Sequence, residues 1–472
     1  MRLSTAAHRG LRAREAAQEA VGHAWTRARD RRLAPPDAVW TTLGGRALAA
    51  RRVTSFVGSK AIDATLAEVT AALTMAGVMH EVAATYPPTV AVPSASWPVV
   101  IAALKPLDLH AQQANGPTPL TRLRPQPGAI RVFRTWASPS GSYLAGADVG
   151  IDLVRGEAPA SVPALGDIDA VFTWVDGADP AWQDRKRQRL QTLTHESLHE
   201  AAANDARFTQ IDELRYALRA VARYAPWIRR IHLVTDGQSP RWLADEFPHV
   251  SLVRHEEIFS DPTALPTFNS HAIESRLHHI PGLAERYLYF NDDFLLGRYA
   301  QPTDYFTTDG RPRVFLTKES VPGGAATLED QPVVAAAKNN AEVLAATTGT
   351  RATFKLKHAP YATLRSVACE LEALAAERFR ETQCSPFRAP SDLSVASSLL
   401  AYYALATGRA VKGEISHFYA DIASEELTWR LPRLLEHRDA AVICLNATFD
   451  VPAAAARRVS AWAGRYFPLL AT

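Results

Sequence analysis

Three short apolar runs in the middle of the chain each end in a turn that carries aspartate, and this pattern constrains the fold more than any other feature. The runs are rich in β-branched and aromatic residues, and the acidic turns that follow them lie at residues 176–179, 236–237 and 291–293. Short apolar runs of this kind are typical of buried parallel strands. Because ligands of open parallel sheets bind beyond the carboxyl ends of the strands, we expect these acids to gather at a ligand site.

The segments around these runs alternate between strand and helix patterns. We expect strands at residues 168–175, 231–235, 250–254 and 287–290, and helices at residues 210–224 and 272–279. Such alternation predicts an α/β domain with a Rossmann-like, mostly parallel sheet.

The paired acids Asp292 and Asp293 indicate a divalent cation site. Mg²⁺ and Mn²⁺ prefer oxygen ligands, and one or two carboxylates typically link them to substrate phosphates. A turn with a helix N-cap uses the same residue types. The recurrence of acids at three strand ends favours the site, and pairs of this kind suggest an enzyme that uses a nucleotide sugar.

The first third of the chain differs in character. Residues 1–53 carry eleven Arg and no Lys against four acids, a net charge of 11 − 4 = +7, whereas the whole chain has a formal charge of +3. We expect a basic helical leader, for which two interpretations stay open: a contact with nucleic acid, anionic lipid or an acidic polymer, or a solvated helix. Residues 54–165 predict a small α+β module, with a helix at 61–82, strand-like runs at 89–92 and 98–102, and a linker at 156–166.

Cysteine use and hydropathy narrow the class of protein. The chain has three Cys, at positions 369, 384 and 444, which is too few and too scattered for a disulfide scaffold or a Cys-ligated zinc site. No run reaches the roughly 18 apolar residues of a membrane span, and arginines interrupt the N-terminal segment where a signal peptide would be apolar. We therefore expect a cytoplasmic protein, at most peripheral at the inner face of the membrane. No motif points to nucleic acid as a partner.

Four blocks of sequence lie in order between residues 168 and 450. The first is IDAVFTWVDGADPAW (168–182), the second covers 212–243 and 265–297, the third covers 355–366 and 385–394, and the fourth is VICLNATFD (442–450). This set resembles the Stealth family of sugar-1-phosphate transferases, which includes bacterial capsule and exopolysaccharide phosphotransferases and the animal lysosomal-enzyme N-acetylglucosamine-1-phosphotransferase. The fourth block departs from the family pattern, because Ala447 stands where the family usually has Asp; Asp450 lies nearby.

The resemblance implies a catalytic domain at residues 166–455, followed by a C-terminal helix or tail at 456–472. It implies an enzyme that moves a hexose-1-phosphate, such as N-acetylhexosamine-1-phosphate, from a nucleotide diphosphate sugar to a hydroxyl of a glycan acceptor, with Mg²⁺ or Mn²⁺ as cofactor. The product would be a phosphodiester. A metal-dependent glycosyltransferase, which transfers the sugar without its phosphate, is the alternative.

The resemblance also implies roles for single residues. Asp292 and Asp293 would hold the metal, with Asp293 essential for catalysis. Arg388 would stabilise charge on the transferring phosphate, and His358 would accept the proton of the acceptor hydroxyl. The remaining implied contacts are with the substrates: Trp174, Asp176, Asp179, Arg215, Asn269, His271, Glu274, Asn291 and Asp392.

Some of these residues also have ordinary structural interpretations. Arg215 could pair with the acid at position 212 or 213, and His271 and Glu274 lie one helical turn apart and could be a plain helix pair. His278, His279 and His417 have no acidic partner at ligand spacing in the sequence, so we expect them to be structural.

Overall fold

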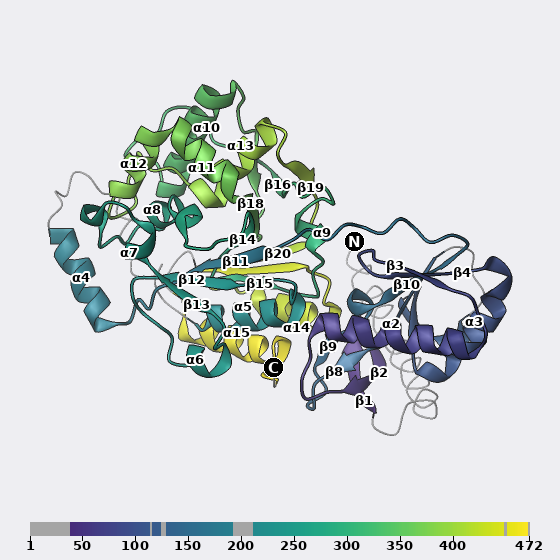
Figure 1. Ribbon diagram of the computed structural model, residues 1–472. Helices are drawn as coiled ribbons and strands as arrows, with labels where there is room; N and C mark the ends of the chain where they lie inside the picture. Colours follow the sequence, from purple (N-terminus) through teal and green to yellow (C-terminus); the bar gives the residue numbers. More distant parts are fainter. Residues whose placement is uncertain (1–37, 114–115, 124–128, 192–210, 448–450, 471–472) are drawn as a thin grey trace, which may run out of the picture. The chain divides into compact units, whose positions relative to one another are not determined.

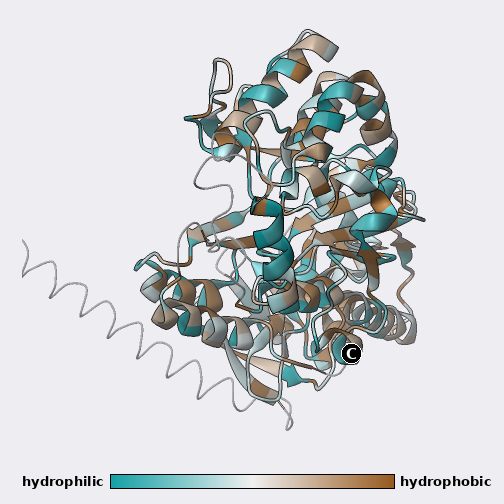
Figure 2. Ribbon diagram, turned by 90° about the vertical axis from the view of Figure 1, so that its left-hand side faces the viewer, coloured by the Kyte–Doolittle hydropathy of each residue, from teal (hydrophilic) through white to brown (hydrophobic). Residues whose placement is uncertain are grey.

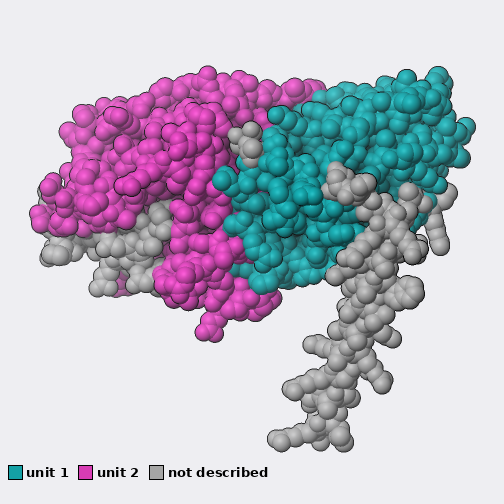
Figure 3. Space-filling view, turned by 90° about the horizontal axis from the view of Figure 1, so that it is seen from below, with its two compact units in different colours: residues 1–162, 430–438, 464–472 teal, residues 163–429, 439–463 magenta. Residues whose placement is uncertain are grey.

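The computed structural model describes residues 38–113, 116–123, 129–191, 211–447 and 451–470. The chain divides into two compact units, which Figure 3 shows in different colours. Unit 1 consists of residues 1–162, 430–438 and 464–472, and unit 2 consists of residues 163–429 and 439–463. The boundary at 162/163 falls inside the segment that the sequence suggests as a linker.

Unit 1 combines helices with two sheets. The first sheet has the order β1-β2-β8-β9, and the second has the order β3-β4-β10-β7-β5-β6. Their strands are β1 (Ala38–Leu43), β2 (Arg46–Arg52), β3 (Glu81–Ala83), β4 (Thr89–Val92), β5 (His110–Gln113), β6 (Gly116–Pro119), β7 (Ile130–Phe133), β8 (Trp136–Ala137), β9 (Tyr143–Ala145) and β10 (Ile151–Arg155). Helix α2 (Gly58–Met75) buries a face that includes Ile62, Val69 and Leu73. These positions recur at helical spacing, which explains why the segment forms a helix.

Three expectations for this unit are wrong in part. The expected helix at 61–82 ends at Met75, and its last residues enter strand β3. Residues 38–52, which we expected to belong to a helical leader, form the antiparallel hairpin β1–β2. Its turn is Gly44-Gly45, with φ of 56° and 74°, a conformation that two glycines adopt without strain and that suits a two-residue hairpin. The rest of the predicted leader, residues 1–37, lies outside the described residues, and the expected membrane contact falls largely there.

The third difference is at residues 98–102, where we expected a strand. They lie inside helix α3 (Trp97–Leu104), which has a proline in its first turn and buries Trp97, Val100 and Leu104. Proline is pre-organised for the first helical turn, and the buried residues recur every three to four positions. A short apolar run is compatible with a strand or a helix, and the flanking proline favours the helix here.

The core of unit 2 is a five-stranded sheet with the order β13-β12-β11-β14-β18 (Figure 1). Its strands are β11 (Ile168–Thr173), β12 (Ile231–Thr235), β13 (Ser251–Arg254), β14 (Arg286–Asn291) and β18 (Tyr361–Leu364). The first four are mutually parallel and β18 is antiparallel to β14. The expected α/β class with a mostly parallel sheet is confirmed, and all four expected strands are present.

Further sheets and helices complete unit 2. A three-stranded sheet has the order β15-β21-β20, and another has the order β17-β16-β19. Their strands are β15 (Phe294–Leu296), β16 (Arg313–Ser320), β17 (Phe354–Leu356), β19 (Val411–Gly413), β20 (His417–Asp421) and β21 (Val442–Asn446). The α-helices are α4 (Pro180–Gln191), α5 (Glu213–Tyr224), α6 (Leu243–Glu246), α7 (His255–Ile258), α8 (Ser270–Glu274), α9 (Pro302–Tyr305), α10 (Pro332–Thr348), α11 (Arg365–Leu374), α12 (Ala376–Cys384) and α13 (Leu400–Ala406).

Helices α14 (Leu427–His437) and α15 (Ala453–Tyr466) each contribute residues to both units. Among the helices of the described residues, none combines the length and the apolar character needed to cross a lipid bilayer. Figure 2 shows apolar strands together with helices that carry both polar and apolar residues. This distribution is typical of amphipathic helices that cover a sheet.

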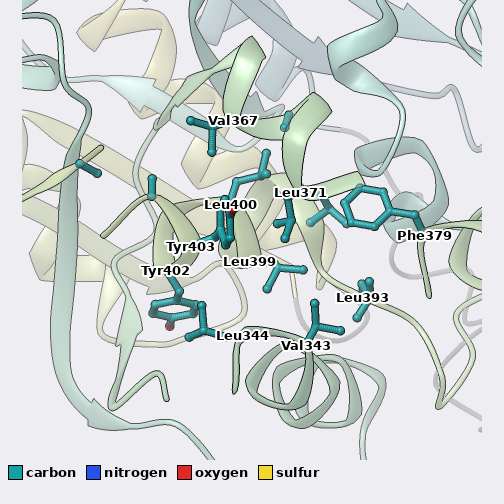
Figure 4. Packing of buried hydrophobic residues seen from close by; sticks show 14 of the residues in the cluster. Val343, Leu344, Val367, Leu371, Phe379, Leu393, Leu399, Leu400, Tyr402 and Tyr403 are labelled. Carbon is teal, nitrogen blue, oxygen red and sulfur yellow. The ribbon is translucent and has the colours of Figure 1, made fainter. Parts of the chain in front are cut away.

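The helical part of unit 2 has its own apolar core (Figure 4). Val343 and Leu344 of α10 face Val367 and Leu371 of α11, and Leu400 of α13 packs among them. This core supports α11, α12 and the segment after α12, which carries Arg388. The packing therefore positions a predicted site residue that lies far from the strand-end acids in the sequence.

The expected helix at residues 272–279 is divided. Helix α8 ends at Glu274, and a separate 3-10 turn spans Leu277–His279. Ile280 after the turn has ψ of 124°, in the extended range. Pro281 follows it, and a proline disfavours helical conformation in the preceding residue, so the helix cannot continue.

Candidate active site

The carboxyl edge of the five-stranded sheet brings two acidic turns together. Strands β11 and β14 are parallel neighbours, with Thr173 opposite Asn291. The loop from Trp174 to Asp179 and the turn with Asp292 and Asp293 therefore leave the same edge from adjacent strands. Parallel sheets typically bind ligands at this edge. Sequence reasoning predicts this meeting of acids, and the register of the strands produces it.

Gln238, which sequence reasoning missed, shapes the loop after β11. Its Nε2 donates to Asp179 Oδ2 at 2.9 Å, and its Oε1 accepts from the backbone N–H of Asp176 at 2.9 Å. The hydrogen bonds from Gln238 and from the Ala181 N–H hold the pKa of Asp179 below its usual value, since they favour the charged carboxylate. Trp174, at the start of the loop, is half-buried. The loop thus presents Asp176 and Asp179 in a conformation fixed by a residue from the neighbouring strand end.

Asp293 lies in an environment that disfavours its charge. Burial and the neighbouring Asp292 raise its pKa to about 7. Its Oδ2 accepts a hydrogen bond from Cys444 Sγ at 3.2 Å, whereas Oδ1 is buried and has no hydrogen-bond partner among the described residues. A buried carboxylate oxygen without a donor is costly unless another group neutralises it.

Glu213 is a third carboxylate at this site, and sequence reasoning missed it. It begins helix α5 and is only 9% exposed. Burial, and then the charges of Asp292 and Asp293, raise its pKa to about 8. Asp292 helps to raise the pKa of both Asp293 and Glu213, and one buried oxygen of Asp293 has no hydrogen-bond partner among the described residues. This arrangement fits a divalent cation that prefers oxygen ligands. Asp292 and Asp293 are the residues that could hold such a cation. Glu213 lies close enough to interact electrostatically with both of them.

Asn269 fixes the segment that carries Arg388. It is fully buried, and its Nδ2 donates to the carbonyls of Ser385 and Phe387 at 3.1 and 3.2 Å and to Asp392 Oδ2 at 2.8 Å. Its Oδ1 accepts from the His271 N–H at 3.0 Å, which makes Asn269 the N-cap of α8. The amide of Asn269 is therefore engaged in joining α8 to the segment after α12.

His271 and Asp392 form a buried pair beside Asn269. Asp392 Oδ2 lies 3.2 Å from His271 Nδ1 and also accepts from the Ala389 N–H at 3.0 Å. Burial and the nearby Arg388 lower the pKa of His271, so the ring is neutral near pH 7 and donates from Nδ1. Glu274, on the same short helix, accepts hydrogen bonds at its Oε2 from the N–H and the hydroxyl of Ser397. His271 and Glu274 are therefore held by Asp392 and Ser397, respectively, and not by a contact with each other.

One buried guanidinium nitrogen of Arg388 is available to bind a ligand. Its Nη2 donates to Ser270 Oγ at 2.7 Å, while Nη1 is buried and has no hydrogen-bond partner among the described residues. Burial lowers the pKa of Arg388, and the charges of Glu274 and Asp392 oppose that effect. A desolvated guanidinium N–H is a strong donor for an anionic oxygen.

His358 lies beside the strand that continues from Asp293. Its ring centroid is 6.2 Å from that of Phe294 and 4.8 Å from that of Tyr419. Crowding by its neighbours removes water from part of the ring, and this effect together with His417 lowers the pKa of His358. His358 as a whole is exposed to solvent. A neutral, accessible imidazole can accept a proton.

The fourth sequence block reaches the site through strand β21. Phe294 of β15 pairs with Cys444 of β21, and Asn446 Nδ2 donates to Tyr419 Oη at 3.2 Å. The block therefore supports Asp293 and the ring beside His358, although it carries Ala447. Asp450 lies outside the described residues.

Buried Tyr289 and partly buried Tyr361 lie between the carboxylates and the Arg388 side of the site. Burial raises the pKa of Tyr289, and the charges of Glu274 and Asp292 raise it further. The pKa of Tyr361 is raised by burial and then by several charges that include Glu274 and Asp293. Each tyrosine therefore lies within electrostatic range of an acid from both groups, which indicates that the two groups lie near one another.

Two sets of residues lie in other arrangements than we expected. Arg215 donates from Nε to Glu246 Oε1 at 2.8 Å, and Arg219 also pairs with Glu246, so the partner is neither of the acids next to it in sequence. His278 and His279 do have an acidic partner, because α11 brings Glu372 to them. The acid is not at ligand spacing in the sequence, because it lies 94 residues from His278 and 93 residues from His279.

Comparison with known families gives three matches. Residues 166–194 match Stealth protein conserved region 1, residues 207–314 match conserved region 2, and residues 357–405 match conserved region 3. The chain belongs to the Stealth protein family. The three conserved regions of this Stealth chain contain every predicted site residue, from the β11 loop through the carboxylates to Arg388.

Two curated relatives of this Stealth chain are bacterial exopolysaccharide phosphotransferases. It is 50% identical over 283 residues to exopolysaccharide phosphotransferase SCO6023 of Streptomyces coelicolor, a match that covers 60% of this chain and 47% of the relative. It is 43% identical over 316 residues to exopolysaccharide phosphotransferase CpsY of Mycobacterium tuberculosis, covering 66% of this chain and 59% of the relative. The chain thus spans about half the length of the curated relatives it matches.

Among solved structures, the galactosyltransferase LgtC in complex with donor and acceptor sugar analogs is similar over 63% of this chain and 95% of that chain. The sequence identity is 12% and the TM-score is 0.32. A likeness at this level carries no argument about the chemistry of the Stealth chain.

Proposed function

We propose that this chain is a phosphotransferase that moves a hexose-1-phosphate from a nucleotide diphosphate sugar to a hydroxyl of a glycan. The observation that carries the proposal is the pairing of two unsatisfied groups in one site: the buried Oδ1 of Asp293 among carboxylates, and the buried Nη1 of Arg388. The first suits a divalent cation and the second suits an anionic oxygen. A metal-bound diphosphate offers both.

The donor would lie beyond the carboxyl edge of the five-stranded sheet. Asp292 and Asp293 would hold Mg²⁺ or Mn²⁺, and Glu213 would add negative charge close to the ion. When bound, the cation would neutralise charge on the diphosphate. Asp176 and Asp179, held by Gln238, would bind hydroxyls of the ribose or the sugar. Trp174, directly after β11, and Asn291, at the end of β14, would flank that position.

In the transfer, the acceptor hydroxyl oxygen forms a bond to the phosphorus that carries the sugar. The bond from that phosphorus to the oxygen bridging to the nucleotide phosphate breaks, and a nucleoside monophosphate leaves. Arg388 Nη1 would donate to a non-bridging oxygen of the transferring group, where charge is concentrated. Neutral His358 would accept the proton of the acceptor hydroxyl.

Three residues with implied substrate contacts fit a positioning role better. Asn269, Asp392 and His271 are buried and are joined by hydrogen bonds to one another and to the segment around Arg388. Removing one of them would displace Arg388 without removing a group that reaches the phosphate. Glu274 lies close enough to act on the charge of Arg388.

The test is incubation of the purified chain with candidate nucleotide sugars, a glycan acceptor and Mg²⁺, followed by chromatography of the nucleotide product. The proposal expects a nucleoside monophosphate and a phosphodiester-linked product. Release of a nucleoside diphosphate would contradict it and support a metal-dependent glycosyltransferase instead.

Arg388→Lys sharpens this test. Lysine has one compact ammonium, which cannot keep the Ser270 contact and also reproduce the planar donor geometry at the phosphate. We expect kcat to fall by about a hundred- to a thousand-fold, as when a transition-state donor is lost. Arg311→Lys is the matched control, because Arg311 pairs with Asp309 on the surface and should keep parent activity. Near-parent turnover of Arg388→Lys would remove Arg388 from the mechanism.

A further inference from the structure

Two adjacent histidines and a distant glutamate form a compact group outside the candidate active site. His278 Nε2 and His279 Nε2 each lie 2.7 Å from the same oxygen, Glu372 Oε2. One potential ligand atom from each of the three residues can be chosen so that all lie within 4.8 Å of one another. The histidines come from the 3-10 turn after α8 and the glutamate from α11.

The second oxygen of Glu372 is occupied by other partners. Arg276 Nη1 donates to Oε1 at 2.6 Å, and Gln383 Nε2 donates to the same oxygen at 3.2 Å. These contacts fix the orientation of the carboxylate and direct Oε2 toward the two imidazoles. Orienting partners of this kind are a regular feature of metal-binding carboxylates and histidines.

We propose that His278, His279 and Glu372 bind a zinc ion. Two imidazole nitrogens and one carboxylate oxygen are ligands that zinc accepts, and three protein ligands leave a fourth tetrahedral position for water. Magnesium and calcium are disfavoured, because they select oxygen ligands. The proposed ion is therefore distinct in chemistry from the one suggested for Asp292 and Asp293.

The two histidine-to-glutamate distances need only a small change to accept the ion, and the three potential ligand atoms lie within 4.8 Å of one another. Ligand atoms at about 2.0–2.1 Å from a tetrahedral zinc are roughly 3.3 Å apart, so each 2.7 Å contact would open by about 0.6 Å. Each histidine would present a lone pair at Nε2 and carry its proton on Nδ1. The side chain of His279 is 37% exposed, so the ion can reach the group from solvent, while His278 is buried.

The site would join two segments that are far apart in the sequence. The histidines lie within conserved region 2 and Glu372 within conserved region 3. Helix α8, with His271 and Glu274, ends three residues before the 3-10 turn, and α12 and the Arg388 segment follow α11. Zinc would thus act as a structural link that holds these two parts of unit 2 together.

The test is zinc binding by the full chain without a histidine tag, after removal of metal by a chelator and with excess Mg²⁺ present. We expect one zinc ion per chain by competition with a chromophoric chelator, and a rise in the thermal midpoint on zinc addition. Co²⁺ in place of zinc should give the intense visible absorption of a tetrahedral site. A parent chain that binds no zinc, and gives no such Co²⁺ spectrum, would overturn the proposal and leave a metal-free hydrogen-bonded cluster.

Variants locate the ion. His279→Gln replaces the exposed ligand with a side chain that can still donate to Glu372, so the fold should be kept. We expect zinc affinity to fall by more than the roughly 10- to 100-fold typical of losing an orienting partner. His249→Gln, which removes an exposed histidine elsewhere, and Asp293→Asn should both bind zinc like the parent. Undiminished binding by His279→Gln, or loss of binding in Asp293→Asn alone, would overturn the assignment.

Discussion

His255 should make the stability of this protein strongly dependent on pH. It begins helix α7 after strand β13 and is only 2% exposed. Neither ring nitrogen has a hydrogen-bond partner among the described residues, and Nδ1 lies 3.9 Å from Asp236 Oδ1, beyond hydrogen-bond reach. Burial lowers the pKa of His255 from 6.5 to about 4, because the charged ring loses its hydration.

The direction of the effect follows from proton uptake. In the unfolded chain this histidine binds a proton below pH 6.5, whereas in the folded chain it does so only below about pH 4. Between these values the unfolded state binds more protons, so the free energy of unfolding falls as the pH is lowered. Above pH 6.5, where His255 is neutral in both states, its titration does not lower the free energy of unfolding. At pH 4.5 it has fallen by about 2.5 kcal/mol, since each pH unit corresponds to about 1.4 kcal/mol.

His255→Phe should abolish this dependence. Phenylalanine has a similar shape, no titratable group, and an aromatic neighbour in Phe259, whose ring centroid is 6.3 Å from that of His255. Urea unfolding of parent and variant, followed by tryptophan fluorescence, is to be compared at pH 7 and pH 4.5. We expect similar stability at pH 7 and a loss at pH 4.5 that is about 2.5 kcal/mol larger for the parent.

His249→Gln is the matched control, because it removes an exposed histidine and leaves His255 in place. It should retain the parent's loss of stability at low pH. An equal loss in the parent and in His255→Phe would refute the reasoning, because another group would then account for the pH dependence.

Three further predictions concern the candidate active site. Asp293→Asn should abolish turnover without lowering the thermal midpoint, and EDTA should do the same reversibly; activity that survives both would remove the metal from the mechanism. His358→Gln should lower kcat by roughly 10²–10⁴-fold. Because neutral His358 is the proposed base and its pKa is lowered, the parent rate should rise with pH through a pKa below 6.5, and this limb should be absent in the variant. Asn269→Ala removes an amide whose two N–H groups are shared among three acceptors, and it also removes an N-cap, so urea unfolding should show a loss of about 2–4 kcal/mol together with reduced activity. Reduced activity with unchanged stability would instead indicate direct substrate contact.

The sequence predicts the sheet of unit 2 well because its signals are local. Strands β11, β12 and β14 are short apolar runs with flanking turn residues, and each ends in an acidic turn. Local signals were weaker in unit 1. The runs at 38–52 and 98–102 carry no periodicity long enough to separate helix from strand, and the turn glycines and the proline at the helix start decide instead.

Residue types and their order in the sequence predict the class of chemistry: acids at strand ends indicate a cation, and the resemblance of the third block to the Stealth family points to Arg388 and His358. Only the tertiary structure decided which groups share an environment. The burial of Glu213 beside Asp292, the thiol of Cys444 on Asp293, the clamp of Asn269 on the Arg388 segment and the meeting of Glu372 with two histidines all join residues 79 to 151 positions apart. Such contacts leave no periodic trace in the sequence, because they depend on the strand order of the sheets and on the packing of helices against the core.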